Sequence, residues 1–453
     1  MLKKVLVANR GEIACRVIRA CRELGIQSVA IYSRADAESS HVRLADRAIC
    51  VGEATNSDSY LNLANVVMAV EISGADAVHP GYGYFSERDQ FAEVLGEMGV
   101  KFIGPPVAAI RAMGDKASAK EAAIKAKCPV VPGSAGIVAD EDEALTIARK
   151  IGFPVLLKAV AGGGGRGIRR VEDEKGLAGA WSIAQQEAQA SFGNGDLILE
   201  KCVVQPRHIE IQVLADEHGN CVFLGERECS VQNPRHQKIL EEAPSAAIDP
   251  GMRKKMGEAA VRVAKQVGYT NAGTMEFLLD KSGHFYFLEM NTRLQVEHPV
   301  TEQVTGYDLV HLQLKIASGE KLPFRQGDIQ LKGHSIEARI TAQDPMKDFA
   351  PSTGKITRWD PPGGHGVRMD TYVYAGISIT PFYDPMIAKL IVTAPTRELA
   401  VARLRSALHE FHVEGIQTNI EFLRRICADP RYAKNEVDTS FVGTFIQEAT
   451  VGT

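Results

Sequence analysis

The chain has 453 residues, 45% of them hydrophobic and 24% charged, and its formal net charge is −4. One hydrophobic core rarely organises a chain of this length, so we expect two or three domains. No long run of like charges is present, which argues against nucleic-acid or membrane-surface binding, and the apolar run at residues 5–8 is far too short for a signal peptide or a membrane span. We therefore expect a cytoplasmic protein, or an organelle-matrix protein whose targeting segment has been removed.

The first hundred residues alternate strand and helix patterns. Residues 4–8 form a short β run, a turn follows at residues 9–12, and apolar side chains then recur at helical spacing up to Gly25. The next strand is expected at residues 28–32, which completes a β-α-β unit and predicts a parallel sheet. Further strands are expected at residues 75–79 and 100–103, so the first domain is predicted to be Rossmann-like.

Eight cysteines occur without any Cys-x-x-Cys pair, so the sequence suggests neither a zinc site nor a redox motif. Cys15 and Cys21 lie six residues apart within the first helical pattern. We expect both to be thiols of the core, because free cysteine behaves there as a small hydrophobic residue.

Residues 115–130 indicate a helical connector, which ends at Cys128-Pro129. A compact αβ segment follows over about residues 131–203, and its size and glycine run suggest a mobile lid. The remainder, about residues 204–450, is predicted to be one larger α+β domain. The strands expected in these two segments are 154–160, 168–171, 197–201, 208–214, 221–225, 274–279 and 284–289. A late amphipathic helix begins at a Thr396 cap and is expected to turn five side chains inward: Leu399, Ala400, Leu404, Leu408 and Phe411.

The last two of those strands form an acidic hairpin. If its turn centres between Ser282 and Gly283, then Glu276 lies opposite Glu289. Directly opposed carboxylates repel each other on an otherwise apolar hairpin and call for a cation. Oxygen ligands of this kind suit Mg²⁺, which takes its remaining ligands from phosphates and water.

The pattern continues beyond the hairpin through residues 290–299. With a period of two residues, Glu289, Asn291, Arg293, Gln295 and Glu297 would share one strand face. This face offers a ligand amide, a guanidinium suited to an oxyanion and a carboxylate that could act as a base. The alternative is an ordinary solvated polar face, but the two glutamates of the hairpin favour a metal and anion site.

A glycine run at residues 161–167 joins two predicted strands, with Lys158 three residues before it. Such runs allow backbone N–H groups to approach phosphate oxygens, and a nearby lysine can add its charge. A flexible hairpin tip is the alternative. The run matches GxGxxG but is followed by a strand instead of a helix, so we reject a dinucleotide site; Ser352–Lys355 likewise lacks the remaining residues of a P-loop.

Taken together, these motifs resemble the biotin carboxylase branch of the ATP-grasp superfamily over essentially the whole chain. The matching stretches are VLVANRGEIACR near the start, HPGYGYFSE (79–87), GDK (114–116), GGGGRG (162–167), RHIEIQVLAD (207–216), RHQK (235–238), EMNTRLQVEHPVTE (289–302) and GHSIEARI (333–340). The resemblance implies an ATP-grasp fold with a Rossmann-like N-terminal domain (1–114), an ATP-grasp region (115–330) that contains the lid, and a C-terminal domain (331–450).

The resemblance also implies a role for individual residues. The ATP contacts are expected to be Lys116, Lys158, Gly164, Gly165, Arg166, Glu200, Lys201, Val203, His208, Gln232, His236 and Leu278. The ligands of Mg²⁺ or Mn²⁺, with two ions expected, are Glu276, Glu289 and Asn291. The bicarbonate and biotin contacts are Lys238, Arg293, Gln295, Val296, Arg339 and Tyr82. Among these, Lys238, Arg293 and Arg339 join the base Glu297 as catalytic residues, and Arg339 is expected to stabilise the biotin enolate.

One segment departs from the family pattern. The family usually reads Cys-Ser-x-Gln-Arg-Arg-His-Gln-Lys, whereas this chain has one extra residue and a proline between Gln232 and His236. The departure bears on the placement of Gln232 and Cys229. We expect His236 and Lys238 to be unaffected, because they follow the insertion.

The implied activity is ATP-dependent carboxylation of biotin, the first half-reaction of a biotin-dependent carboxylase such as acetyl-CoA carboxylase in fatty-acid synthesis. The chain has no Met-Lys-Met biotinylation site, so biotin is expected on a separate carrier protein, with carboxyltransferase subunits and a second copy of this chain as further partners. Two other classes remain open. Another ATP-grasp ligase, such as a carbamoyl-phosphate-forming enzyme, would share the hairpin, and a non-catalytic nucleotide-binding scaffold could lack the base.

Overall fold

The computed structural model describes residues 2–160 and 167–451. The chain divides into two compact units. The large unit comprises Met1–Cys128, Arg207–Phe277 and Glu289–Thr453, and the small unit comprises Pro129–Pro206 and Leu278–Leu288.

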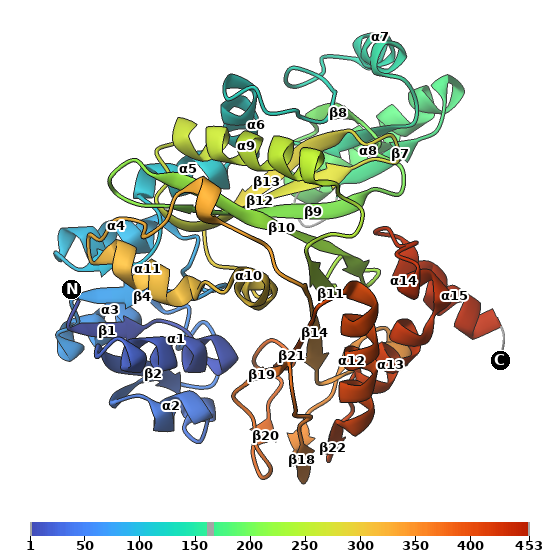
Figure 1. The fold of residues 1–453 in the computed structure, drawn as a ribbon. Helices are drawn as coiled ribbons and strands as arrows, with labels where there is room; N and C mark the ends of the chain where they lie inside the picture. The colour runs from blue at the N-terminus through green and yellow to red at the C-terminus, as the bar shows by residue number, and fades with distance from the viewer. Residues whose placement is uncertain (1, 161–166, 452–453) are drawn as a thin grey trace. The chain divides into compact units, whose positions relative to one another are not determined.

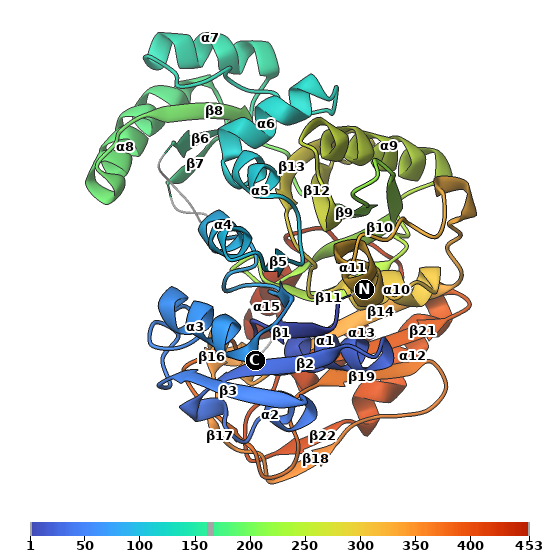
Figure 2. The same ribbon diagram turned by 90° about the vertical axis from the view of Figure 1, so that its left-hand side faces the viewer.

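The large unit begins with the predicted parallel sheet, whose strand order is β3-β2-β1-β4-β5 (Figures 1 and 2). The strands are β1 (Lys4–Val7), β2 (Gln27–Ser33), β3 (Arg47–Gly52), β4 (Ala77–His79) and β5 (Lys101–Phe102). Helix α1 (Gly11–Glu23) is followed by Gly25, whose φ of 70° suits glycine. The Rossmann-like prediction is confirmed, and Cys15 and Cys21 are fully buried thiols. The other helices here are α2 (Ser40–Leu44), α3 (Leu63–Ser73), α4 (Asp89–Glu97), α5 (Val107–Gly114) and α6 (Lys116–Lys125).

An eight-stranded sheet, ordered β13-β12-β9-β10-β11-β14-β21-β19, forms the centre of the rest of the large unit. Its strands are β9 (Arg207–Ala215), β10 (Cys221–Gln232), β11 (Lys238–Ala243), β12 (Asn271–Leu279), β13 (Phe285–Asn291), β14 (His334–Thr341), β19 (Val367–Thr371) and β21 (Met386–Ala394). The pairs from β9 to β19 along this order are antiparallel. Strand β10 is longer than predicted, because Gly225 (φ 85°) interrupts the apolar run while the chain bulges and stays paired with β9.

Helices cover this sheet. Helix α12 (Arg397–Glu410) lies along β14 and β21 (Figure 1) and packs into a core with α13 (Ile420–Ala428). The other helices are α9 (Pro250–Gln266), α10 (His298–Thr305), α11 (Leu309–Ala317), α14 (Pro430–Ala433) and α15 (Phe441–Val451). Three short strand pairs complete the unit: β15 (Gln343–Asp344) with β16 (Ala350–Pro351), β17 (Gly354–Lys355) with β20 (Ser378–Ile379), and β18 (Arg358–Asp360) with β22 (His412–Glu414).

The small unit has its own sheet and core. Its strands β6 (Val155–Ala159), β7 (Ile168–Val171) and β8 (Leu197–Lys201) follow the order β7-β6-β8, and helices α7 (Glu141–Ile151) and α8 (Glu174–Phe192) pack against them (Figure 2). The three predicted strands are confirmed. The tip of the β12–β13 hairpin, Leu278–Leu288, also belongs to this unit.

Two predictions of local structure are wrong. Leu399 is 53% exposed, because the buried stripe of α12 runs through Ala400, Leu404 and Leu408 to Phe411, and Leu399 lies beside it. The strand expected to run through residue 299 ends at Asn291, because Pro299 lies in the first turn of α10 and the chain must turn into that helix.

No helix in the part of the chain that the structure describes is long and apolar enough to cross a membrane.

Glu242 on β11 supplies a buried ionic contact between the sheet and α12. Its carboxylate lies 2.6 Å from His334 Nε2 and 2.7 Å from Arg397 Nε. Burial alone would raise the pKa of Glu242, but hydrogen bonds from His334 and Arg397 lower it from 4.5 to about 2. The contact therefore stabilises the fold fully above pH 4.5, and its contribution is lost as the pH falls from about 4.5 to about 2.

We predict that Glu242→Gln lowers the free energy of unfolding by about 3 kcal/mol at neutral pH and flattens its pH dependence between about pH 4.5 and 2. Urea unfolding over this pH range measures both effects. The matched control is Glu421→Gln, at a glutamate whose side chain is 71% exposed, which should change stability by less than about 0.5 kcal/mol. Equal effects of the two substitutions would contradict the role given to Glu242.

Candidate active site

One buried lysine joins three carboxylates at the centre of the eight-stranded sheet. The ammonium of Lys238 lies 2.7 Å from Glu210, 3.0 Å from Glu276 and 2.7 Å from Glu297. Burial alone would lower the pKa of Lys238, but the three carboxylates raise it well above its usual value. The lysine therefore stays charged and holds three acidic groups together where repulsion would separate them.

The strands place these groups by simple alternation. On β9, His208, Glu210 and Gln212 have a period of two and share one face, and their side chains are buried. Lys238 opens β11 and pairs with Gln232 at the end of β10.

The turn between these two strands contains the extra residue and is organised by Asn233. The Asn233 side-chain oxygen accepts from the backbone N–H groups of Arg235 and Gln237. His236 is exposed in this turn at a φ of 61°. The turn thus accommodates the extra residue, and the Lys238 side chain still lies at the centre of the sheet.

Glu297 lies between two cations. Its Oε1 accepts from Lys238, and its Oε2 accepts from Arg339 Nη2 at 3.0 Å. Burial alone would raise the pKa of Glu297, but Lys238, Arg339 and Arg227 together lower it well below its usual value. The carboxylate is therefore ionised. It sits at the N-cap position of α10, outside any strand.

Arg339 on β14 is bound by two carboxylates, those of Glu297 and Glu241. Its Nε donates to Glu241 at 2.6 Å, while Glu337 lies directly opposite Glu241 in the pairing of β11 with β14. Directly opposed side chains are about 5 Å apart at Cβ, so two ionised glutamates would repel strongly there. Neither oxygen of Glu337 has a hydrogen-bond partner, and burial together with Glu241 raises its pKa well above the usual value. Glu337 is therefore the neutral member of the pair.

The loop after β13 connects the remaining predicted anion-binding groups to this cluster. Arg293 donates to Asn291 at 2.8 Å and to Glu87 at 2.9 Å. Gln295 donates to Glu276 at 2.8 Å and accepts from the buried Arg227 at 2.8 Å. The predicted strand face does not exist beyond residue 291, but the side chains still converge, because the turn into α10 directs them toward Glu276 and Lys238.

The three predicted metal ligands lie close together on β12 and β13. The amide of Asn291 donates to Glu276 at 2.9 Å. Partial burial and the negative charge of Glu276 raise the pKa of Glu289. A carboxyl group whose ionisation is opposed by a neighbouring carboxylate fits a site that a divalent cation completes, and two carboxylates with an amide oxygen suit Mg²⁺. Lys238, which contacts Glu276, therefore supplies only part of the positive charge that these carboxylates were predicted to need.

Other predicted nucleotide contacts of the large unit are placed as follows. His208 lies 3.0 Å from Glu276, and its Nδ1 lies 3.1 Å from the Gln232 amide, which also donates to the Cys229 carbonyl. Lys116 is exposed at the first position of α6, and its charge favours ionisation of Glu289. His208, Gln232 and Lys116 thus lie around the predicted metal ligands.

The small unit carries the remaining predicted nucleotide contacts. Lys158 on β6 forms an ion pair with Glu200 on β8. The ammonium of Lys201 donates to the carbonyls of Gly152 and Phe153, each at 2.8 Å, so this side chain anchors its own unit. Val203 is half-buried just beyond β8, and Leu278 is half-buried on β12. Gly164, Gly165 and Arg166 lie outside the described residues.

A cavity of about 380 Å³ in the large unit opens beside the Lys238 cluster. Four predicted substrate contacts line it: Tyr82, Lys238, Val296 and Arg339. Glu12 lines it as well, and its carboxylate accepts a hydrogen bond from the Tyr82 hydroxyl. Four of the six predicted substrate residues thus line one open cavity, and two of them, Lys238 and Arg339, contact the ionised Glu297.

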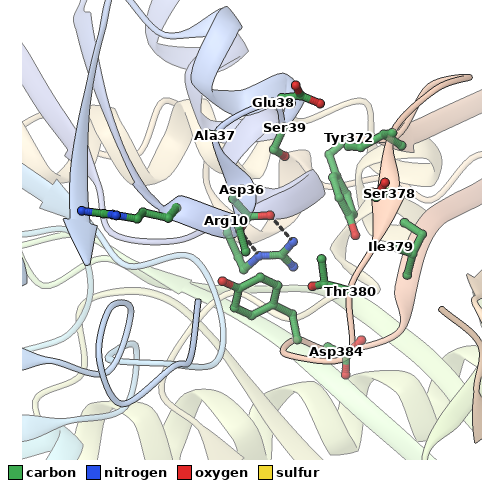
Figure 3. Close-up of a pocket in the computed structure, with 14 residues that line it drawn as sticks. Arg10, Asp36, Ala37, Glu38, Ser39, Tyr372, Ser378, Ile379, Thr380 and Asp384 are labelled. Carbon is green, nitrogen blue, oxygen red and sulfur yellow. Dashed lines mark hydrogen bonds and ion pairs between the residues drawn. The ribbon is translucent and has the colours of Figure 1, made fainter. Parts of the chain in front are cut away.

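A second cavity, of about 250 Å³, lies next to the first (Figure 3). Arg10 lines both cavities, and its guanidinium is paired with Asp36 and stacked 4.0 Å from the Tyr383 ring centroid. Every predicted site residue that the structure describes lies outside its lining.

The sequence analysis missed several buried charges that complete the site. These are Glu12, Glu210, Arg227, Glu241 and Lys389; the sequence analysis also missed Glu87, which binds Arg293 but is exposed. Glu210 could have been found from the alternation of its strand with His208. The others could not, because their partners come from segments that are distant in the sequence and meet only in the folded sheet.

Three family models match consecutive parts of the chain. They are "Biotin carboxylase, N-terminal domain" at residues 1–110, "Carbamoyl-phosphate synthase L chain, ATP binding domain" at residues 115–325, and "Biotin carboxylase C-terminal domain" at residues 337–444. The Rossmann-like sheet and the ATP-binding module define the chain as an ATP-grasp enzyme.

Curated relatives match over nearly the full length. The chain is 52% identical to the biotin carboxylase of Nostoc sp. over 97% of this chain and 98% of that protein, and 51% identical to biotin carboxylase 1 of Bacillus subtilis over 98% and 99%. It is 52% identical to the 2-oxoglutarate carboxylase small subunit of Hydrogenobacter thermophilus over 98% and 93%. The chain belongs to the biotin carboxylase family of ATP-dependent ligases.

Solved structures agree. The biotin carboxylase domain dimer of the Hydrogenobacter thermophilus 2-oxoglutarate carboxylase, in complex with MgADP, ADP and bicarbonate, superposes with a TM-score of 0.89 at 51% identity, covering 98% of each chain. The Campylobacter jejuni biotin carboxylase complex with a β,γ-ATP ligand gives a TM-score of 0.91 at 46% identity, covering 98% of this chain and 99% of that one. The predicted family and fold class are confirmed.

We predict that Glu337→Gln changes the free energy of unfolding by less than about 1 kcal/mol, because an amide replaces a carboxyl group that is already neutral. Glu241→Gln, at the matched position across the strand pair, should cost about 3 kcal/mol, because it removes the charged partner of Arg339. The pKa of Glu241 is raised to about 7 by burial, so both variants are best unfolded in urea at about pH 8, where Glu241 is ionised. A larger loss from Glu337→Gln than from Glu241→Gln would show that the charge lies on Glu337 instead.

Proposed function

We propose that this protein uses MgATP and bicarbonate to carboxylate biotin on a carrier protein, giving N-carboxybiotin, ADP and phosphate. The observation that carries the proposal is the placement of Glu297, an ionised base between Lys238 and Arg339. These two cations border a cavity that the predicted biotin contact Tyr82 also lines. A base between two cations suits an anionic substrate that must lose a proton.

Bicarbonate is proposed to bind to the same cations that now hold Glu297. Lys238 and Arg339 keep the pKa of Glu297 low, which makes it a weak base. A bound anion that takes over their hydrogen bonds would weaken their hold on Glu297 and add its own negative charge, and both effects raise the pKa of the carboxylate. Glu297 would therefore become a stronger base when its substrate arrives.

The deprotonated bicarbonate oxygen would then attack the γ-phosphorus of ATP, forming carboxyphosphate while the bond to ADP breaks. Mg²⁺ held by Glu276, Glu289 and Asn291 would neutralise charge on the transferring phosphoryl group. Arg293 and Gln295 are proposed to orient the bicarbonate. Their side chains are fixed by Glu87, Asn291, Glu276 and Arg227, so they are ordered before any substrate binds.

The second stage is proposed to occur on the cavity side. Carboxyphosphate would decompose into CO2 and phosphate, and the phosphate would take the ureido proton of biotin. The biotin nitrogen would attack CO2 while Arg339 stabilises the enolate oxygen by its positive charge. Because Glu241 binds Nε of Arg339, its Nη groups remain directed toward Glu297 and the cavity.

The individual nucleotide contacts stay predictions. They include Lys116, His208, Gln232 and His236 of the large unit, and Lys158, Gly164, Gly165, Arg166, Glu200, Lys201, Val203 and Leu278 of the small unit. The three-part division at residues 114 and 330, the lid at about 131–203 and the cytoplasmic location also stay predictions.

The proposed half-reaction implies partner proteins and a final acceptor of the carboxyl group. We propose a separate biotin carboxyl carrier protein, carboxyltransferase subunits and a homodimer; a relative's biotin carboxylase domain is a dimer. Acetyl-CoA as the final acceptor stays a prediction, because relatives named for 2-oxoglutarate and propionyl-CoA carboxylases match at 52% and 48% identity. The carbamoyl-phosphate alternative is disfavoured by the biotin carboxylase models that match on both sides of the ATP-binding module.

The direct test is ATP cleavage by the purified protein, with bicarbonate, free biotin and Mg²⁺ each omitted in turn. We expect cleavage to require Mg²⁺ and bicarbonate and to rise with biotin, with labelled bicarbonate entering an acid-labile biotin adduct. Cleavage that depends on an amine and ignores biotin would identify a different ATP-grasp ligase.

We predict that Glu297→Gln lowers bicarbonate-dependent ATP cleavage at least about 100-fold, the range expected when a general base is lost. The Kd for ATP should stay within about twofold, because the substitution leaves the nucleotide contacts intact. The control is Glu337→Gln, which makes the same chemical change on a neutral buried glutamate of the same unit. Full activity of Glu297→Gln would remove this residue as the base.

A further inference from the structure

Lys389 is a buried lysine that has no role in the proposed reaction steps. It lies on β21 with none of its side chain exposed. Its ammonium donates to the carbonyl oxygen of Val296 at 2.9 Å and forms an ion pair with Glu12 at 3.1 Å. A charge buried this deeply is costly unless it is well paired, and the charges of Glu12 and of Asp370, which lies directly opposite Lys389 on β19, offset that cost.

The two partners of Lys389 come from different segments that line the larger cavity. Val296 lies in the turn before α10, and Glu12 lies in the first turn of α1, after β1. Both residues line the cavity, and the Tyr82 hydroxyl donates to the same Glu12 oxygen that contacts Lys389. Lys389 thus connects the turn that contains Val296 to Glu12, and through Glu12 to Tyr82.

This contact holds a backbone carbonyl in the turn before α10. Residues 292–297 lie in neither strand nor helix, and Val296 directly precedes the base Glu297. A fixed carbonyl at Val296 fixes the peptide plane that leads into Glu297, because the peptide group is planar. A shift of this turn would misplace the carboxylate relative to Lys238 and Arg339.

The charge pattern explains why Lys389 stays out of the site. In the pairing of β14 with β21, Lys389 lies directly opposite Arg339, so two cations are neighbours. Each has its own carboxylate: Arg339 is bound by Glu241, and Lys389 is bound by Glu12. Burial alone would lower the pKa of Lys389, but Glu12 and the other nearby carboxyl groups raise it, so the ammonium is charged.

We propose that Lys389 is a positioning residue for the base: through Val296 it orients Glu297, and through Glu12 it holds the Tyr82 side of the cavity. The inference rests on the proposed function, because it assigns Lys389 to the carboxylation site. It differs from a purely structural role, because it predicts a loss in the steps that use bicarbonate and biotin and none in nucleotide binding.

The test compares Lys389→Met with the double variant Lys389→Met/Glu12→Gln. The single variant should lower kcat for bicarbonate-dependent ATP cleavage at least about 10-fold and raise KM for bicarbonate severalfold, with KM for MgATP within about twofold. It should also unfold more easily, because Glu12 is left as an unpaired buried charge.

The double variant separates the two roles. Removing both charges should restore the unfolding midpoint, but kcat should stay low, because the Val296 carbonyl still lacks its donor. Recovery of kcat together with stability would overturn the inference and leave Lys389 as a charge partner only. If the single variant does not fold, the double variant alone decides between these outcomes. A wild-type protein that cleaves no ATP with bicarbonate would instead contradict the proposed function itself.

Discussion

The site depends on one ammonium group, that of Lys238, which lies within 3.0 Å of three glutamates. Three carboxylates this close would repel one another in a low-dielectric interior, and the sheet could not bring them together without a cation. Once the lysine is in place, Glu210 can bind Arg227, Glu276 can bind Asn291 and Gln295, and Glu297 can bind Arg339. Lys238 thus links Glu276, a proposed metal ligand, to Glu297, the proposed base.

A second constraint is the pairing of like charges across neighbouring strands. Glu241 faces Glu337, and Arg339 faces Lys389. The structure resolves the first pair by keeping Glu337 neutral, and the second by giving each cation a separate carboxylate. This arrangement leaves Arg339 directed at Glu297 and turns Lys389 away, toward the Val296 carbonyl. Two neighbouring cations with different partners can thus serve different purposes, one at the substrate and one at the backbone.

Local patterns in the sequence predicted the local features of the fold and site. Helical spacing and Gly25 predicted α1, and the two glutamates of the β12–β13 hairpin indicated a cation site. The period of two beyond Asn291 grouped Arg293, Gln295 and Glu297 correctly but for the wrong reason, because these residues form a turn and not a strand. Glu12 and Lys389 could not be paired from the sequence, since they are 377 positions apart and meet only through the sheet. The ionisation of Glu337 likewise depends on cross-strand register, which no local pattern reports.

The central claim is that Lys238 keeps the base Glu297 ionised. The most direct measurement is the pH dependence of kcat/KM for bicarbonate in Lys238→Gln and wild type, with the bicarbonate concentration varied at each pH, because this ratio reports ionisation in the free enzyme. Removing the ammonium should raise the pKa of Glu297, so the acid limb should move to higher pH, by about one unit or more. An unchanged limb with only a lower plateau would show that Lys238 binds substrate without setting the charge of Glu297, which would contradict this account.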